Sequence, residues 1–292
     1  MRQIRDMHPF SVTVFFVCVT VLAMSVSHPA VTAASLVLSA LLFTVLKGAK
    51  SIRTHILILI FFIIFTLINP VISHKGSTIL FMVNDTPVTL ESLLYGLNAA
   101  AGLCSVFYWV FSFSAVMDSE RMLCVFGFIS PRAALVASCS IRYLTLIKEQ
   151  YRRTKLSMRA IGLYTDGNIV DLIRGNMRVF SSVIGWALEN GIATADSMAA
   201  RGCGSTKRTA FSVKKFRLGD GVFMAAALML SALCVTCSAL GSLKITFYPE
   251  TVISPADAAG FIGIASFILL AVMPSAIETG VKLKWRLSMS EV

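Results

Sequence analysis

Residues 7–46 read MHPFSVTVFFVCVTVLAMSVSHPAVTAASLVLSALLFTVL and contain no Asp, Glu, Lys or Arg. This run is long enough for two passes through a bilayer, because one helical pass needs about 17–25 mainly apolar residues. Ser-His-Pro at 27–29 separates its two halves and predicts a tight helical hairpin, with a re-entrant pair as the alternative. Arg2 and Arg5 precede it, as in a signal peptide, but the apolar run continues past any cleavage point and predicts a retained anchor.

The whole sequence is too apolar for a soluble protein. Of its 292 residues, 56% are hydrophobic and 14% are charged, whereas soluble domains average roughly 45–50% apolar and about 25% charged residues. Six apolar segments come close to the length that crosses a membrane as a helix. They predict an all-α polytopic membrane protein with about six transmembrane helices, at residues 10–26, 30–46, 56–72, 88–117, 219–243 and 256–277.

The fourth apolar segment carries signals for a helix start. Thr86 is placed to cap the helix, and Pro87 would occupy its first position, where a missing N–H costs nothing. Glu91 then falls in the first turn, where a carboxylate interacts favourably with the helix dipole.

Positive charge is unevenly distributed along the chain, which has 26 Lys and Arg against 15 Asp and Glu and a formal charge of +11. If the N-terminus is cytoplasmic and the six segments alternate, 24 of the 26 basic residues face the cytoplasm, and only Lys75 and Lys244 do not. This agrees with the positive-inside rule. The sequence therefore predicts cytoplasmic termini and three regions: a four-span region 1–117, a cytoplasmic region 118–218, and residues 219–292 with two spans and a basic tail.

Region 118–218 holds sixteen of the basic residues and seven acidic ones. Two long helices are predicted in it, about 131–161 and 168–201, because Gly162 and Gly202 suit the left-handed position that follows a helix. The second helix has an apolar stripe that needs a partner, which could be the sister helix, the membrane surface or another protein. The stripe comprises Ile169, Leu172, Ile173, Phe180, Val183, Ile184, Ala187, Leu188, Ile192 and Ala195.

We find no motif that predicts a catalytic, cofactor-binding or metal site. The string nearest to a P-loop, 202–209, lacks a Gly directly before its Lys, so the chain itself is not expected to bind ATP phosphates. Cys234 and Cys237 form a C-x-x-C in an uncharged stretch without a second pair, which favours packing over metal binding. The acidic residues of the spans lie near the ends and indicate no proton relay (Glu91, Asp257 and Glu278).

Three segments together resemble the transmembrane T component of energy-coupling factor (ECF-type) ABC transporters. The first is Asn69-Pro70 with HKGSTILF at 74–81 and TPVTLESLLYG at 86–96. The second runs from Ser130-Pro131 to Ile-Arg-Tyr at 141–143, and the third is ENGIATADSMAARGCGSTKRT at 189–209. The resemblance covers roughly residues 65–215, and the flanking spans match in arrangement.

The resemblance implies a non-catalytic coupling subunit of an ATP-driven importer for a micronutrient, either a vitamin or a metal ion. Such a subunit joins two cytosolic ABC ATPases, which bind ATP and Mg, to a small substrate-binding membrane subunit in a bacterial or archaeal plasma membrane. Family members carry two coupling helices that end in Ala-Arg-Gly-like motifs, whose arginines dock on the ATPases. Here the second motif is Ala200-Arg201-Gly202.

The first motif departs from the family pattern. It reads Ala160-Ile161-Gly162, with Ile161 at the arginine position. Arg159 is close in sequence, but two residues along a helix correspond to a rotation of about 200°, so its side chain projects from the opposite face. We therefore expect Arg201 to be the principal docking cation, and Ile161 favours two unequal docking sites for two different ATPases. The alternative is that both arginines only interact with their own helix dipoles.

Two other classes of function remain open. A self-contained secondary transporter would need charged pairs or broken helices in mid-membrane, and neither is visible in the sequence. A membrane-anchored basic module would use region 118–218 on anionic lipid or nucleic acid, but it lacks an aromatic series for base stacking, so we expect no nucleic-acid partner. The transported substrate is not encoded in this chain, because in the family specificity belongs to the partner.

Overall fold

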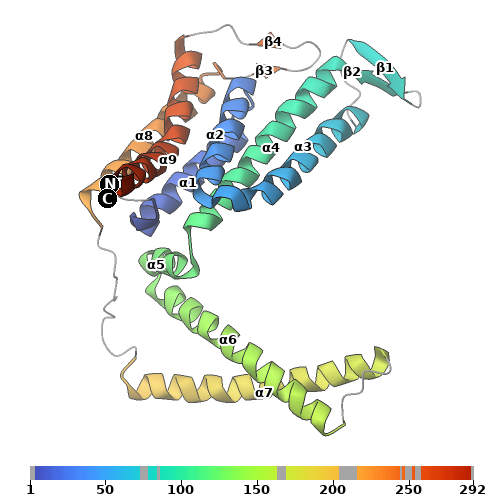
Figure 1. The fold of residues 1–292 in the computed structure, drawn as a ribbon, viewed down its shortest axis with the longest axis vertical. Helices are drawn as coiled ribbons and strands as arrows, with labels where there is room; N and C mark the ends of the chain where they lie inside the picture. The colour runs from blue at the N-terminus through green and yellow to red at the C-terminus, as the bar shows by residue number, and fades with distance from the viewer. Residues whose placement is uncertain are drawn as a thin grey trace. The chain divides into compact units, whose positions relative to one another are not determined.

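The computed structural model describes residues 4–72, 78–83, 86–162, 169–203, 216–243, 245–246, 252–253 and 258–290. Within them the chain is predominantly helical, with nine α-helices and two short antiparallel strand pairs, β1–β2 and β3–β4 (Figure 1). The elements are α1 Pro9–Ser25, α2 Pro29–Lys47, α3 Ile52–Ile72, β1 Ile79–Val83, β2 Thr86–Thr89, α4 Leu90–Val116, α5 Ser119–Ile129, α6 Pro131–Ala160, α7 Ile169–Ala200, α8 Leu218–Ala239, β3 Ile245–Thr246, β4 Val252–Ile253 and α9 Ala258–Ser290.

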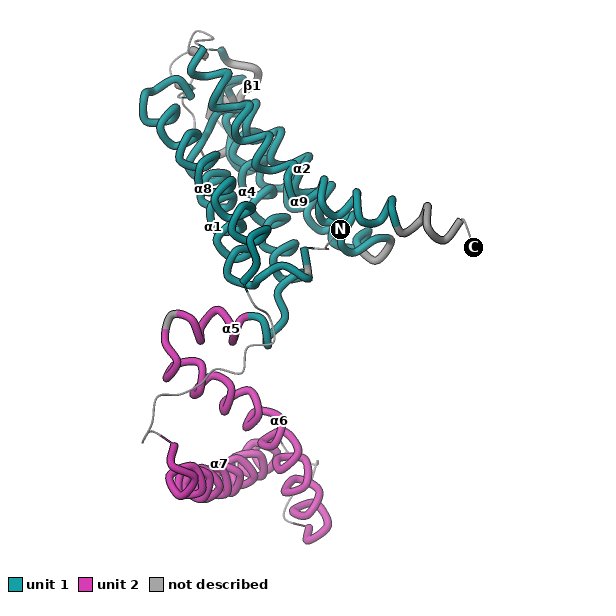
Figure 2. The backbone as a smooth tube through the Cα atoms, turned by 90° about the vertical axis from the view of Figure 1, so that its left-hand side faces the viewer, with its two compact units in different colours: residues 1–121, 214–292 teal, residues 122–213 magenta. Residues whose placement is uncertain are grey.

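The chain divides into two compact units, coloured separately in Figure 2. Unit 1 comprises residues 1–121 and 214–292 and contains α1–α4, α8 and α9. Unit 2 comprises residues 122–213 and contains most of α5 together with α6 and α7. The two terminal regions of the sequence thus belong to one helical bundle, in which α8 packs on α1 and α9 packs on α2.

Five described helices are long and apolar enough to cross a membrane, at Pro29–Lys47, Ile52–Pro70, Leu90–Val116, Leu218–Ala239 and Ala258–Lys284. The apolar helix α1, with 17 residues, is shorter. All six coincide with predicted spans to within four residues, except at the end of α9, which continues to Ser290 beyond the predicted end at 277. The chain is a membrane-embedded protein. Lys75, Lys244 and Asp257 lie outside the described residues.

The predicted start of the fourth span is wrong. Thr86 and Pro87 lie in β2, and α4 begins at Leu90 with Thr89 as its N-cap, whose hydroxyl accepts the Ser92 N–H at 3.3 Å. The reason is that residues 86–89 pair with β1 in a hairpin, which the helix-start signals did not reveal.

Glu91 fastens this hairpin to the helix. Its side chain is 5% exposed, and its carboxylate accepts the Thr78 hydroxyl at 2.7 Å and the Thr78 N–H at 3.3 Å. The predicted place of Glu91 in the first helical turn is confirmed. The carboxylate therefore serves both the helix N-terminus and a tertiary contact.

The centre of unit 1 is an aromatic and small-residue contact between α1, α2 and α4. Trp109 of α4 is fully buried and contacts the rings of both Phe15 and Phe16 on α1, and its indole N–H donates to the Ser35 hydroxyl of α2 at 3.1 Å. Asn98 lies nearer the start of the same helix, and its side-chain oxygen accepts the Thr32 hydroxyl at 2.6 Å. Small polar side chains of this kind let helices approach closely in a membrane bundle.

A glycine sets the spacing between α3 and α4. A Cβ atom added to Gly96 would lie 2.9 Å from the Cβ of Asn69 and 3.2 Å from the Thr66 carbonyl oxygen. The α3–α4 contact therefore requires a residue without a side chain at position 96.

Candidate functional site

The predicted site residues lie at the C-terminal ends of α6 and α7 in unit 2. Helix α6 begins as its sequence predicts, with Pro131 at the first position and the Ser130 hydroxyl accepting the Ala133 N–H at 3.4 Å. Helices α6 and α7 have 30 and 32 residues, and both predicted ranges are confirmed to within one residue of the described bounds. Residues 204–209, the end of the third resembling segment, lie outside the described residues.

Helix α7 ends in a Schellman motif around Arg201. The Arg201 N–H donates to the Ser197 carbonyl at 3.2 Å, Gly202 to Ala199 at 2.9 Å, and Cys203 to Met198 at 3.0 Å. Gly202 has a φ of +74°, the left-handed conformation that glycine adopts without strain. Arg201 thus occupies the C-cap position, and its side chain is exposed.

Helix α6 shares the described part of this cap around Ile161; residue 163, the counterpart of Cys203, lies outside the described residues. The Ile161 N–H donates to the Ser157 carbonyl at 3.2 Å, the Gly162 N–H donates to Arg159 at 3.0 Å, and Gly162 also has a φ of +74°. Ile161 therefore holds the C-cap position that Arg201 holds in α7, and it is 72% exposed. Both glycine stops are confirmed.

Arg159 is not the structural counterpart of Arg201. It lies two residues before the C-cap of α6, the position that Ala199 occupies in α7. Its side chain is exposed, but it leaves the helix about 200° around the axis from Ile161. The two helix ends therefore match in backbone and differ in the side chain that each presents at its C-cap.

The charges near the two ends also differ. Residues 145–160 of α6 carry five basic residues and one acid, Glu149, which pairs with Arg153 at 2.5 Å on the surface. The corresponding part of α7, residues 185–200, has two acids, Glu189 and Asp196, and no basic residue before Arg201. Within the described residues, the α6 end is accordingly a broad basic surface, whereas residues 185–203 of α7 and its cap contain one cation, Arg201. The basic residues of α6 are Lys148, Arg152, Arg153, Lys155 and Arg159.

Two tyrosines of α6 fix the crossing of the helices. The Tyr143 hydroxyl donates to the Asn190 carbonyl at 2.8 Å and lies 2.6 Å from the Thr194 hydroxyl. The Tyr151 hydroxyl donates to the Asn176 side chain at 3.4 Å. The pairing runs in opposite directions along the two helices, so they cross antiparallel, as Figure 1 also shows.

The apolar stripe of α7 divides into two faces. Val183, with Gly175 and Val179, is buried where α7 packs on α6. Six large residues of the stripe are exposed and, together with Met177, form what we call the outer face, each 44–76% exposed. The sister helix therefore covers only one edge of the predicted stripe. The outer face comprises Ile169, Ile173, Met177, Phe180, Ile184, Leu188 and Ile192.

Sequence reasoning missed the residues that hold the helix pair together. Tyr143 belongs to one of the resembling segments, but nothing in its spacing showed a contact with Asn190 or Thr194. An apolar stripe interrupted by Gly175 was the available signal, because small residues mark close helix contacts. The described residues include no group of three or more His, Cys, Asp or Glu that could hold a metal ion.

No protein-family model and no curated protein matches this sequence. The site presents surfaces suited to binding another molecule. They are the exposed, capped ends of α6 and α7, which differ in side chain, and the exposed outer face of α7.

Proposed function

We propose that this chain is the transmembrane coupling subunit of an ECF-type importer, joining two cytosolic ABC ATPases to a small membrane subunit that binds a vitamin or a metal ion. One observation carries the proposal. The membrane bundle is accompanied by a separate helix pair, α6 and α7, whose ends share one backbone geometry within Ala-x-Gly and each expose the central side chain, Ile161 or Arg201.

In this arrangement all six apolar helices of unit 1, α1 included, cross the membrane, and unit 2 lies in the cytoplasm with both chain termini. The charge distribution supports this topology, because 24 of the 26 basic residues then face the cytoplasm. The ATPases bring ATP and Mg, and this chain supplies binding surfaces and no catalytic group.

Arg201 is the docking cation of the second coupling helix. A guanidinium presents fixed donors to carboxylates and backbone carbonyls, and the C-terminus of a helix is a favourable place for a cation. The Schellman motif holds the backbone at Arg201 rigid, so little conformational entropy is lost when a partner binds it.

The two docking sites are unequal and suit two different ATPases. Among the described residues, the α7 end offers Arg201 as its cation, whereas the α6 end offers the apolar Ile161 beside a broad basic surface. One ATPase would then bind the α7 end through an acidic or carbonyl partner for Arg201. The other would bind the α6 end through an apolar groove for Ile161 with an acidic rim facing the basic residues.

The outer face of α7 is the surface that meets the substrate-binding subunit. Its seven large apolar side chains are exposed in the described structure, and an isolated soluble helix would not keep so wide an apolar face uncovered. Movement of the ATPases, passed to α6 and α7 through their ends, would reach the substrate-binding subunit through this face.

Co-purification tests the proposal. The full-length tagged chain is expressed in its own host and purified in mild detergent, and the bound proteins are identified by mass spectrometry. We expect two different proteins with P-loop motifs, one small polytopic membrane protein, and uptake by the reconstituted complex that requires ATP hydrolysis. Uptake driven by an ion gradient without ATP would contradict the proposal and favour a secondary transporter.

A further inference from the structure

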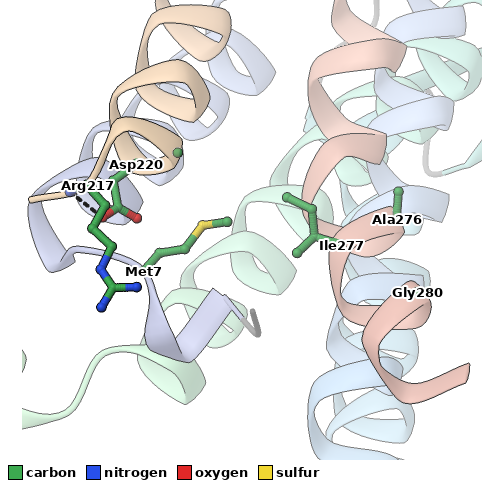
Figure 3. Close-up of a pocket in the computed structure, with 7 residues that line it drawn as sticks. Met7, Arg217, Asp220, Ala276, Ile277 and Gly280 are labelled. Atoms are coloured by element: carbon green, nitrogen blue, oxygen red, sulfur yellow. Dashed lines mark hydrogen bonds between the residues drawn. The ribbon is translucent and has the colours of Figure 1, made fainter. Parts of the chain in front are cut away.

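A cleft with a volume of about 600 Å³ opens at the end of unit 1 where α1 and α8 begin (Figure 3). One wall is formed by the start of α1 and of α8, and the other by the later part of α9. The volume falls within the roughly 300–1,000 Å³ of pockets that hold small ligands. The lining residues are Met7, Arg217, Gly219, Asp220, Ala276, Ile277 and Gly280.

The interior of the cleft is apolar. Gly219, Ala276 and Gly280 leave it open because they carry little or no side chain. The side chains of Met7 and Ile277 point toward one another across it (Figure 3). A methionine at such a surface adapts readily to flexible hydrocarbon.

The two charged lining residues have different surroundings. Asp220 is 3% exposed, and its carboxylate accepts the N–H of His8 at 3.3 Å and of Arg217 at 3.2 Å. Its carboxylate therefore connects the first turns of α1 and α8 through these hydrogen bonds. Arg217, by contrast, is an exposed residue that lines the cleft, so its guanidinium can receive an anion.

The cleft also lies at the end of apolar helices. Arg217 directly precedes the 22-residue apolar helix α8, whose first residue, Leu218, is 90% exposed. Ala276 and Gly280 belong to the apolar segment Ala258–Lys284 of α9. An arginine at the end of a span beside an apolar recess matches the two parts of a phospholipid, because the guanidinium pairs with phosphate and the recess accepts an acyl chain.

We propose that this cleft binds one anionic phospholipid, with its phosphate on Arg217 and an acyl chain between Met7 and Ile277. The occupant is a lipid rather than a soluble phosphate, since the apolar walls contribute only when hydrocarbon is attached. The site rests on the geometry of unit 1 and does not depend on the coupling role of unit 2. It would fix the starts of α1 and α8 to the membrane surface.

Native mass spectrometry of the purified full-length chain tests this site. After delipidation, the chain receives dioleoylphosphatidylglycerol or dioleoylphosphatidylcholine at equal concentration. We expect one phosphatidylglycerol to be retained at least tenfold more strongly than phosphatidylcholine, because the choline cation of phosphatidylcholine offsets the phosphate charge that Arg217 would pair with. Arg217→Gln should remove this preference, and Ala276→Phe, which fills the recess, should reduce retention of both lipids at least tenfold.

Matched variants control for general effects. Arg174→Gln removes an exposed cation from α7, and Ala225→Phe enlarges an exposed alanine of α8, so both should bind lipid as the natural chain does. Glycerol phosphate, the headgroup without hydrocarbon, should not displace the lipid. Equal retention of both lipids by the natural chain, unchanged retention in either cleft variant, or displacement by glycerol phosphate would overturn the proposal.

Discussion

At the scale of single residues, two glycines and one arginine define the proposed docking sites. Gly162 and Gly202 have the same φ of +74° and make the corresponding backbone hydrogen bond at the ends of α6 and α7, so the residue before each glycine is set at a C-cap. The sequence predicted these stops because glycine is the residue that adopts the left-handed conformation without a steric penalty. From the sequence, only the rotation along the helix separated Arg159 from Arg201. The hydrogen bonds at both helix ends show that Ile161, and not Arg159, holds the position of Arg201.

Gly96 gives a residue-scale prediction about stability. Gly96→Ala places a Cβ atom 2.9 Å from the Asn69 Cβ and should destabilise the bundle by about 1–3 kcal/mol, the usual cost of overpacking a core. Gly102→Ala in the same helix is the matched control, because its added Cβ would meet only Thr32 at 3.9 Å. Thermal unfolding in detergent should show a lower Tm for Gly96→Ala alone. Equal Tm values for the two variants would mean that the α3–α4 contact tolerates a side chain.

At the scale of elements, the sequence patterns predicted where the helices lie along the chain better than they predicted which segments pack against each other. The apolar runs placed α2, α4 and α8 to within four residues, because hydrocarbon thickness dictates their length, whereas α9 continues to Ser290, beyond its predicted end at 277. The start of α4 was misplaced, since Thr86 and Pro87 are favoured both before a helix and in a hairpin strand, and only the pairing with β1 decides between them. Likewise, periodicity marked the whole α7 stripe without distinguishing Val183, which faces α6, from the exposed outer face.

The inequality of the two helix ends gives an element-scale prediction. Ile161→Arg makes the exposed C-cap residue of α6 the same as that of α7. If the ends select different ATPases, this variant should lower retention of the ATPase bound at α6 several-fold and allow the other ATPase to replace it. The stoichiometry of purified complexes measures this directly. Complexes that contain one ATPase species in both positions, together with no effect of Ile161→Arg, would refute two distinct sites.

At the scale of the whole molecule, composition and charge indicated a membrane bundle with a basic region, and the structure resolves two compact units. What the sequence did not show is that residues 1–121 and 214–292 form one unit, because the contacts of α8 with α1 and of α9 with α2 join residues far apart in the chain. Apolar runs predict that a helix is buried in lipid but carry little information about which helices are neighbours.

Topology gives a prediction at this scale. Cys203 is exposed at the end of α7, and with the other cysteines replaced it should react with a membrane-impermeant maleimide in inside-out vesicles and not in intact cells. A cysteine at Leu240, 76% exposed at the end of α8, should show the opposite pattern in a cysteine-free background. Labelling of Cys203 from outside intact cells would reverse the proposed orientation.

The central claim is that Arg201 joins this chain to an ATPase, and a comparison of Arg201→Ala with Arg159→Ala tests it most directly. Both variants remove an exposed arginine near a helix end, but only Arg201 occupies a C-cap. The measurement is the affinity of the purified chain for its co-purifying ATPases. We expect Arg201→Ala to weaken it by about 2–5 kcal/mol, the usual cost of truncating a buried interface charge, with little change for Arg159→Ala. Equally mild effects of the two variants would contradict the account.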